Sequence, residues 1–167
     1  MIPEILTIDD KKKEKFLRQK TVDFDFKKST PKEINELLQR MKKIMRAANG
    51  IGLSANQIGL NHKVFVAEIP DPQGSLKFYA IFNPYIEKTG DETVVLEEGC
   101  LSIPGKFGAV TRTTRINVTG FDKAGRPIKI KAWGLLARVF QHEIDHLNGK
   151  LFIDRTKKVY DSEETIS

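Results

Sequence analysis

The sequence predicts a single α+β domain in which antiparallel β-sheets pack around a central helix. Three observations support this fold class: helical spacing of apolar residues at 34–45, short β-branched and aromatic runs at 62–132, and helical spacing again at 133–148. The order contains neither a βαβ alternation nor an internal repeat. Because 167 residues suffice for one hydrophobic core, we expect one domain spanning 1–167.

Two helices are predicted before the strands. A short charged helix is expected near residues 9–20, where KKKEK at 11–15 is interpreted as a solvated face, with a basic contact arm as the alternative. An amphipathic helix begins at Thr30-Pro31-Lys32-Glu33, a capping-box sequence with proline at the first helical position. Asn49-Gly50 ends this helix. Its helically spaced apolar positions are Ile34, Leu37, Leu38, Met41, Ile44 and Met45.

The middle of the chain is predicted to form antiparallel strands and hairpins. Residues rich in Asp, Pro and Gly separate the runs at 71–74, 89–91 and 122–125. The β-branched and aromatic runs themselves are 64–66, 78–82, 93–96, 116–121 and 128–130.

A further helix is predicted from Trp133 to Asn148, ended by Asn148-Gly149. At about 100° per residue, its side chains sort into stripes. One stripe carries Leu135, Val139, His142 and His146, and a polar stripe carries Arg138, Gln141, Asp145 and Asn148. Leu136, Phe140 and Leu147 widen the apolar arc. We therefore expect the sheets to enclose this helix and both histidines to point inward.

Composition narrows the class of protein. No apolar run reaches the roughly 20 residues of a membrane span, and the N-terminus lacks the order of a signal peptide, so a cytoplasmic protein without membrane contact is expected. The net charge is +6, but the lysines are scattered rather than interleaved with aromatic residues, which gives little indication of nucleic-acid binding. The single cysteine, Cys100, is a buried small residue, a reactive thiol or a metal ligand.

The segment His142-Glu143-Ile144-Asp145-His146 indicates a metal site. Two imidazoles one helical turn apart can bind the same ion, and Glu143 supplies a carboxylate beside them. The alternative is a pair of buried core histidines. A zinc protease would require a further ligand downstream, but the usual downstream patterns are absent. Cys100 is the candidate third ligand, which would leave a coordination position open for water.

The segment from Gly50 to Gln57, GIGLSANQ, permits two interpretations. It is either a helix end followed by a turn, or a loop in which the Gln57 amide donates to a developing oxyanion. It is not a phosphate-binding loop, because no Gly-Lys-Ser/Thr follows.

Taken together, GIGLSANQ, EGCLS and QHEIDHLNG resemble, in this order, the three signature motifs of the peptide deformylases. The resemblance covers nearly the whole chain, and Ser54 stands where the family pattern has alanine. It implies that Cys100, His142 and His146 bind the metal and that Glu143 is the general acid/base. It also implies an oxyanion hole formed by Gln57 and the backbone N–H of Leu101.

The implied reaction removes the formyl group from the N-terminal formyl-methionine of nascent polypeptides and releases formate. Metal-bound hydroxide attacks the formyl carbon while Glu143 transfers the proton. One divalent ion per chain is expected: Fe²⁺ in the cell, with Zn²⁺, Ni²⁺ or Co²⁺ after purification. The partners expected are N-formyl-methionyl peptides, with a transient ribosome contact as a further possibility and no DNA.

Substrate contacts are expected from two sources. Leu135 and Val139, on the histidine stripe, are candidate walls of a methionine pocket. By resemblance, the backbone at Ile51, Gly52 and Gly99 pairs with the peptide as an added strand.

Arg112 is expected near the metal-binding helix, paired with Asp145 or Glu98, and the alternative is an exposed strand arginine. Two rival functions stay open from the sequence: a general zinc aminopeptidase or protease, and a structural zinc protein or degenerate binding module.

Overall fold

Residues 5–162 are described by the structure, a computed structural model, and they form the α+β fold that the sequence predicts. The termini of the expected domain, 1–4 and 163–167, lie outside the described residues. The helices are α1 (Lys11–Leu17), α2 (Pro31–Ala47) and α3 (Gly134–Leu147), with short 3-10 turns η1 (Phe26–Lys28), η2 (Ala55–Ile58) and η3 (Phe152–Arg155). The strands are β1 (Gly52–Ser54), β2 (Val64–Pro70), β3 (Leu76–Thr89), β4 (Thr93–Cys100), β5 (Ile103–Thr113), β6 (Arg115–Phe121), β7 (Pro127–Trp133) and β8 (Val159–Asp161).

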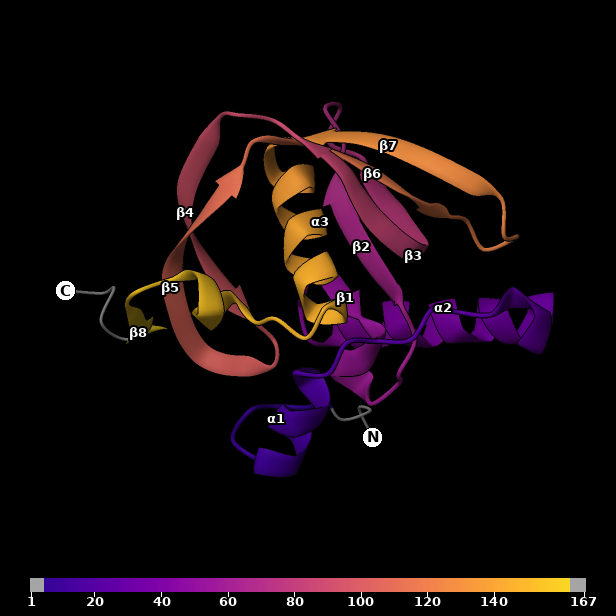
Figure 1. The fold of residues 1–167 in the computed structure, drawn as a ribbon, viewed down its shortest axis with the longest axis horizontal. Coiled ribbons are helices and arrows are strands. Elements are labelled where there is room, and N and C mark those ends of the chain that lie inside the picture. The colour runs from indigo at the N-terminus through magenta and orange to yellow at the C-terminus, as the bar shows by residue number, and fades with distance from the viewer. Residues whose placement is uncertain (1–4, 163–167) are drawn as a thin grey trace.

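The strands form two antiparallel sheets with α3 between them (Figure 1). One sheet has the order β1-β2-β3-β6-β7 and the other β4-β5-β8. The expected hairpins at 71–74 and 122–125 are confirmed, since β2 pairs with β3 and β6 with β7. A hairpin at 89–91 is wrong: β3 pairs with β6, so this turn carries the chain from one sheet to the other.

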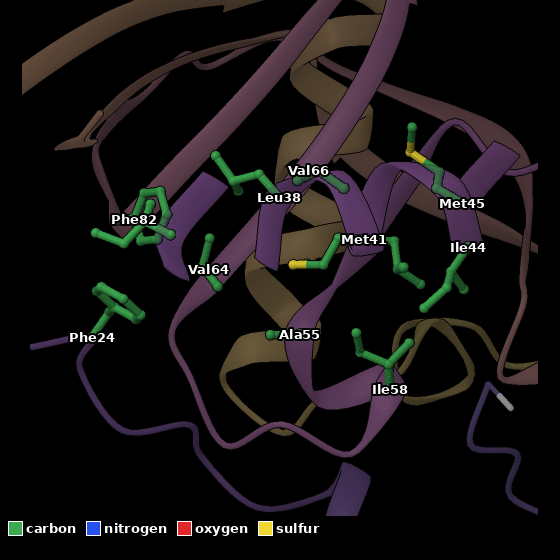
Figure 2. Packing of buried hydrophobic residues seen from close by; sticks show 12 residues of the cluster. Phe24, Leu38, Met41, Ile44, Met45, Ala55, Ile58, Val64, Val66 and Phe82 are labelled. Atoms are coloured by element: carbon green, nitrogen blue, oxygen red, sulfur yellow. The ribbon is translucent and has the colours of Figure 1, made fainter. Parts of the chain in front are cut away.

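Helix α2 covers one face of the larger sheet at β1 and β2. The capping box at Thr30 is present, and the left-handed conformation that ends the helix falls on Asn49, at φ 56°. Figure 2 shows Leu38, Met41 and Ile44 of α2 packed toward the residues of β2 that point away from α3. Those residues are Val64 and Val66, whereas the alternating Phe65 and Ala67 pack with α3 on the opposite face.

Helix α3 is enclosed as predicted, with Phe140 and Leu147 fully buried. Its polar stripe is buried as well, including Arg138 and Asp145. The charged helix near residues 9–20 is shorter than expected, with Leu17 as its buried residue. No helix of residues 5–162 is long and apolar enough to cross a membrane.

Candidate active site

Three ligand atoms converge from two elements that are distant in sequence. Cys100 ends β4, whereas His142 and His146 lie one turn apart on α3. The Nε2 atom of His146 lies 3.1 Å from Cys100 Sγ and 3.2 Å from His142 Nε2. Because one ligand atom from each residue lies within 4.8 Å of the others, a single ion can contact all three.

The chemistry of these donors fits a divalent transition metal. His142 Nδ1 lies 2.9 Å from Glu98 Oε1. An ionised carboxylate only accepts hydrogen bonds, so Nδ1 carries the proton and Nε2 turns its lone pair toward Cys100 and His146. Thiolate and imidazole ligands suit zinc, iron, nickel and cobalt rather than magnesium or calcium.

The protonation states of the ligands follow from their contacts. Burial raises the pKa of the Cys100 thiol, but His146 and His142 outweigh burial and hold this pKa well below its ordinary value. Burial lowers the pKa of His142, whereas Cys100 and Glu98 raise it, to about 10. Both shifts favour an imidazolium beside a thiolate. A metal ion competes with that proton for the same nitrogen lone pair.

Glu143 lies beside the ligands, and its side chain is enclosed. The residue is 3% exposed, burial raises its pKa, and no described group forms a hydrogen bond with Oε2. A Cβ atom at Gly52 would lie 2.5 Å from Glu143 Oε1, so the backbone of β1 approaches the carboxylate as closely as glycine permits. The site therefore contains a desolvated carboxyl group suited to proton transfer.

The first motif orients the amide of Gln57. Its Oε1 accepts a hydrogen bond from the Ser54 backbone N–H at 3.0 Å. Its Nε2 consequently faces Ser102 Oγ at 3.1 Å and Cys100 Sγ at 3.7 Å. The Ser54 hydroxyl is buried and finds partners in Asn56 Oδ1, at 2.8 Å, and Gln57 Oε1, at 3.1 Å.

Asn56 connects this motif to α3. Its side-chain amide donates to the backbone carbonyl of His146 at 2.6 Å. The sequence patterns indicate no role for Asn56 or Ser102, although both residues belong to the quoted motifs.

A buried ionic network fixes α3 against the smaller sheet. Arg112 is 4% exposed and donates to both Glu98 oxygens, at 2.9 and 2.8 Å, and to Asp145 at 2.6 Å. Arg112 is therefore buried, which excludes the alternative of an exposed strand arginine, and both candidate carboxylates are its partners. Burial raises the pKa of Glu98, but Arg112 and His142 lower it to about 2. Arg138 donates to Glu98 Oε2, the oxygen that also accepts from Arg112 Nε, and Arg155 donates to Asp145 at 2.7 Å.

Arg138 was not among the expected site residues. Beyond Glu98, it donates to the Val94 carbonyl at 3.0 Å and to the Val110 carbonyl at 3.2 Å, so it connects α3 with β4 and β5. The sequence feature that indicates it is its place on the polar stripe of α3, which also carries Asp145.

A pocket of about 620 Å³ opens onto the ligands. Ile51 and Leu135 line it with exposed side chains, whereas Val139 is buried. Phe107 and Pro104 of β5 also line it, and no sequence motif indicated them. The other expected site residues in its lining are Gly52, Gln57, Glu98, Gly99, Cys100, Leu101, His142 and Glu143.

The arrangement belongs to the metal-dependent hydrolases. A structural zinc site is closed by a fourth protein ligand, whereas here three ligand atoms converge beside an open pocket and a desolvated carboxyl group.

The model of the polypeptide deformylase family matches residues 2–162, and the chain belongs to this family. The peptide deformylase of Elusimicrobium minutum is 44% identical over 147 residues, covering 84% of this chain and 82% of the relative. That of Halothermothrix orenii is 41% identical over 128 residues, covering 77% and 80%.

Solved structures of peptide deformylases have the same fold as this chain. A probable peptide deformylase from Synechococcus phage S-SSM7 superimposes with a TM-score of 0.81 at 41% identity, covering 91% of this chain and 98% of that one. A peptide deformylase from Synechococcus elongatus in complex with actinonin gives 0.82 at 36% identity, covering 95% and 81%. The protein is therefore a metal-dependent enzyme that removes the formyl group from N-formyl-methionine.

Proposed function

We propose that Cys100, His142 and His146 hold the divalent ion of this deformylase and that Glu143 is its general acid/base. The observation that carries the proposal is the convergence of the three ligand atoms beside the buried Glu143 carboxyl group. A bound ion of this kind lowers the pKa of coordinated water to about 7 and polarises a carbonyl oxygen.

Each remaining step belongs to a side chain or backbone group of the chain. Glu143 accepts the proton of the attacking water and returns it to the departing amine, which becomes the free methionine N-terminus. Glu143 must act first as a base and then as an acid. Burial raises its pKa, and a group that fills both roles works best when its pKa lies near the working pH. Gln57 Nε2 and the Leu101 backbone N–H donate to the formyl oxygen as charge develops there.

The pocket beside these groups receives the methionine side chain. Val139 and Leu135 supply apolar walls on the same stripe of α3 as the two histidines, which places the side-chain site next to the reacting carbonyl. The backbone of Ile51, Gly52 and Gly99 lines the same pocket and pairs with the peptide as an added strand. Recognition through backbone groups accommodates nascent chains of different sequence.

The experiment that tests these roles measures formate release from formyl-methionyl peptides together with metal content. Cys100→Ser and His146→Ala should lose both the ion and the activity, whereas Glu143→Gln should keep the ion and lose the activity. Loss of metal in Glu143→Gln would contradict its assignment as a proton-transfer group.

Three features of the working enzyme complete the proposal. As the resemblance to the family implies, the ion used in the cell is Fe²⁺, with Zn²⁺, Ni²⁺ or Co²⁺ taken up after purification; Fe²⁺ binds such ligands more weakly than Zn²⁺, so its use depends on cellular availability. The protein acts in the cytoplasm as one domain over residues 1–167. It meets its substrates as nascent chains, with a transient ribosome contact. Metal analysis of protein purified without oxygen tests the first feature.

A further inference from the structure

The outer face of β3, β6 and β7 collects cations and aromatic rings that are scattered in sequence. Residues directly opposite in antiparallel strands share a face of the sheet. Trp133 of β7 lies opposite Arg115 of β6. Asn117 of β6 lies between Lys131 of β7 and Lys88 of β3, and Thr119 of β6 lies between Lys129 of β7 and Tyr85 of β3. We call this the outer basic face, defined by Tyr85, Lys88, Arg115, Lys129, Lys131 and Trp133.

Alternation along β6 and β7 explains why their side chains on this face point outward, and the register shift between Ile86 and Lys88 of β3 brings Tyr85 and Lys88 to the same face. The intervening residues Ile116, Val118 and Ala132 are buried in the core cluster that contains α3. Helix α2 packs over the sheet at β1 and β2, and its core cluster reaches β6 at Phe121, at the opposite end of that strand from Arg115. Figure 1 shows β7 as the outermost strand of the larger sheet. Both Tyr85 and Trp133 are 64% exposed.

The charges on this face are largely unneutralised. Among the described residues, Lys88, Arg115 and Lys131 form no ion pair, whereas Lys129 is paired with Glu87 at 2.8 Å. The three unpaired cations and Trp133 line one pocket of about 390 Å³. Asp91 and Glu92 follow Gly90 in the chain, but neither residue lines this pocket.

We propose that the outer basic face binds single-stranded RNA, with phosphates on Lys88, Arg115 and Lys131 and bases stacked on Trp133 and Tyr85. Strand geometry places the Cα atoms of Tyr85 and Trp133 roughly 17 Å apart, since the two residues are separated by four residues along β7 and by two strand spacings. Single-stranded nucleic acid is bound by this combination, a positively charged surface with exposed aromatic rings that accept unstacked bases.

The alternatives fit the face less well. An acidic peptide would use the cations but leave both aromatic rings without a partner. Paired bases in a duplex cannot stack on side chains that project from a sheet. Trp133 directly precedes α3, and Leu135 two residues later lines the active pocket, so RNA bound here would hold the pocket close to the RNA. The inference does not depend on the catalytic roles assigned above.

The experiment uses the intrinsic fluorescence of Trp133, the only tryptophan in the chain. Titration with a short single-stranded RNA should quench this fluorescence as a base stacks on the ring. The same sequence annealed into a duplex, and polyglutamate, should bind more weakly and leave the fluorescence nearly unchanged. Log affinity should fall with log salt by about 0.7 for each phosphate neutralised.

Variants separate the proposal from nonspecific attraction. Lys88→Ala/Lys131→Ala should reduce the salt slope by about 0.7 per lysine, and Tyr85→Ala should weaken binding by about fivefold or more. The matched control, Lys43→Ala/Lys157→Ala, removes two exposed lysines elsewhere and should retain the parent slope. Formate release by every variant should match the parent, which verifies folding.

Three results would overturn the proposal: no RNA binding, equal weakening in the control variant, or binding of polyglutamate as tight as that of RNA. The last result would identify the face as a site for acidic proteins.

Discussion

The most direct test of the site geometry is Gly52→Ala, which adds one methyl group beside the Glu143 carboxyl group. The new Cβ would lie 2.5 Å from Glu143 Oε1, 3.0 Å from Cδ and 3.1 Å from Cγ. Ordinary contact begins at 3.4 Å, so the carboxyl group must retreat by roughly 1 Å. Glu143 is 3% exposed and cannot swing into solvent. A misplacement of about 1 Å can cost about 100-fold in rate.

We therefore expect Gly52→Ala to lower kcat/KM for a formyl-methionyl peptide by about 100-fold while the metal content stays at one ion per chain. Formate release measures the first quantity and elemental analysis the second. Gly90→Ala is the matched control, because its Cβ would meet no neighbour closer than 3.4 Å and no ligand residue is nearby. Activity of Gly52→Ala within threefold of the parent, with metal retained, would refute the claim that this glycine positions Glu143.

Three further predictions concern the same site. Glu143→Gln should bind metal nearly as well as the parent and lose at least 100-fold in kcat, since only proton transfer is removed; steady-state rates at fixed metal loading decide this. Gln57→Ala should lower kcat by about 10²–10³, and an effect on KM alone would instead make Gln57 a substrate-positioning residue. Ser54→Ala should lower kcat by less than about tenfold, because the backbone N–H of Ser54 still donates to the Gln57 oxygen. Arg112→Ala and Asp145→Ala should each lower the free energy of unfolding by about 3–5 kcal/mol, and thermal melts of the singles and the double should show non-additive losses; simple additivity would rule out direct coupling.

Local chemistry explains what could be predicted from the sequence. The capping box at Thr30 and the one-turn spacing of His142 and His146 depend on neighbours within a few residues, so the helical period alone determines them. The strand β5 was indicated only through Arg112, because glycines and charges interrupt its apolar alternation. The three ordered motifs identified the family and indicated the candidate ligands, although neither periodicity nor spacing could show that residues 100 and 142 meet.

Tertiary structure decided everything that depends on which strand packs against which helix. Packing of the smaller sheet on α3 brings Cys100 to the histidines and buries the polar stripe, where Arg112 joins Glu98 to Asp145. Sheet register likewise turns lysines that are scattered along the chain into one basic face around Trp133. Local patterns in the sequence predict the candidate reactive groups and the helices and strands that carry them, because both depend on neighbours within a few residues. Their meeting depends on contacts between residues dozens of positions apart, which no local pattern encodes.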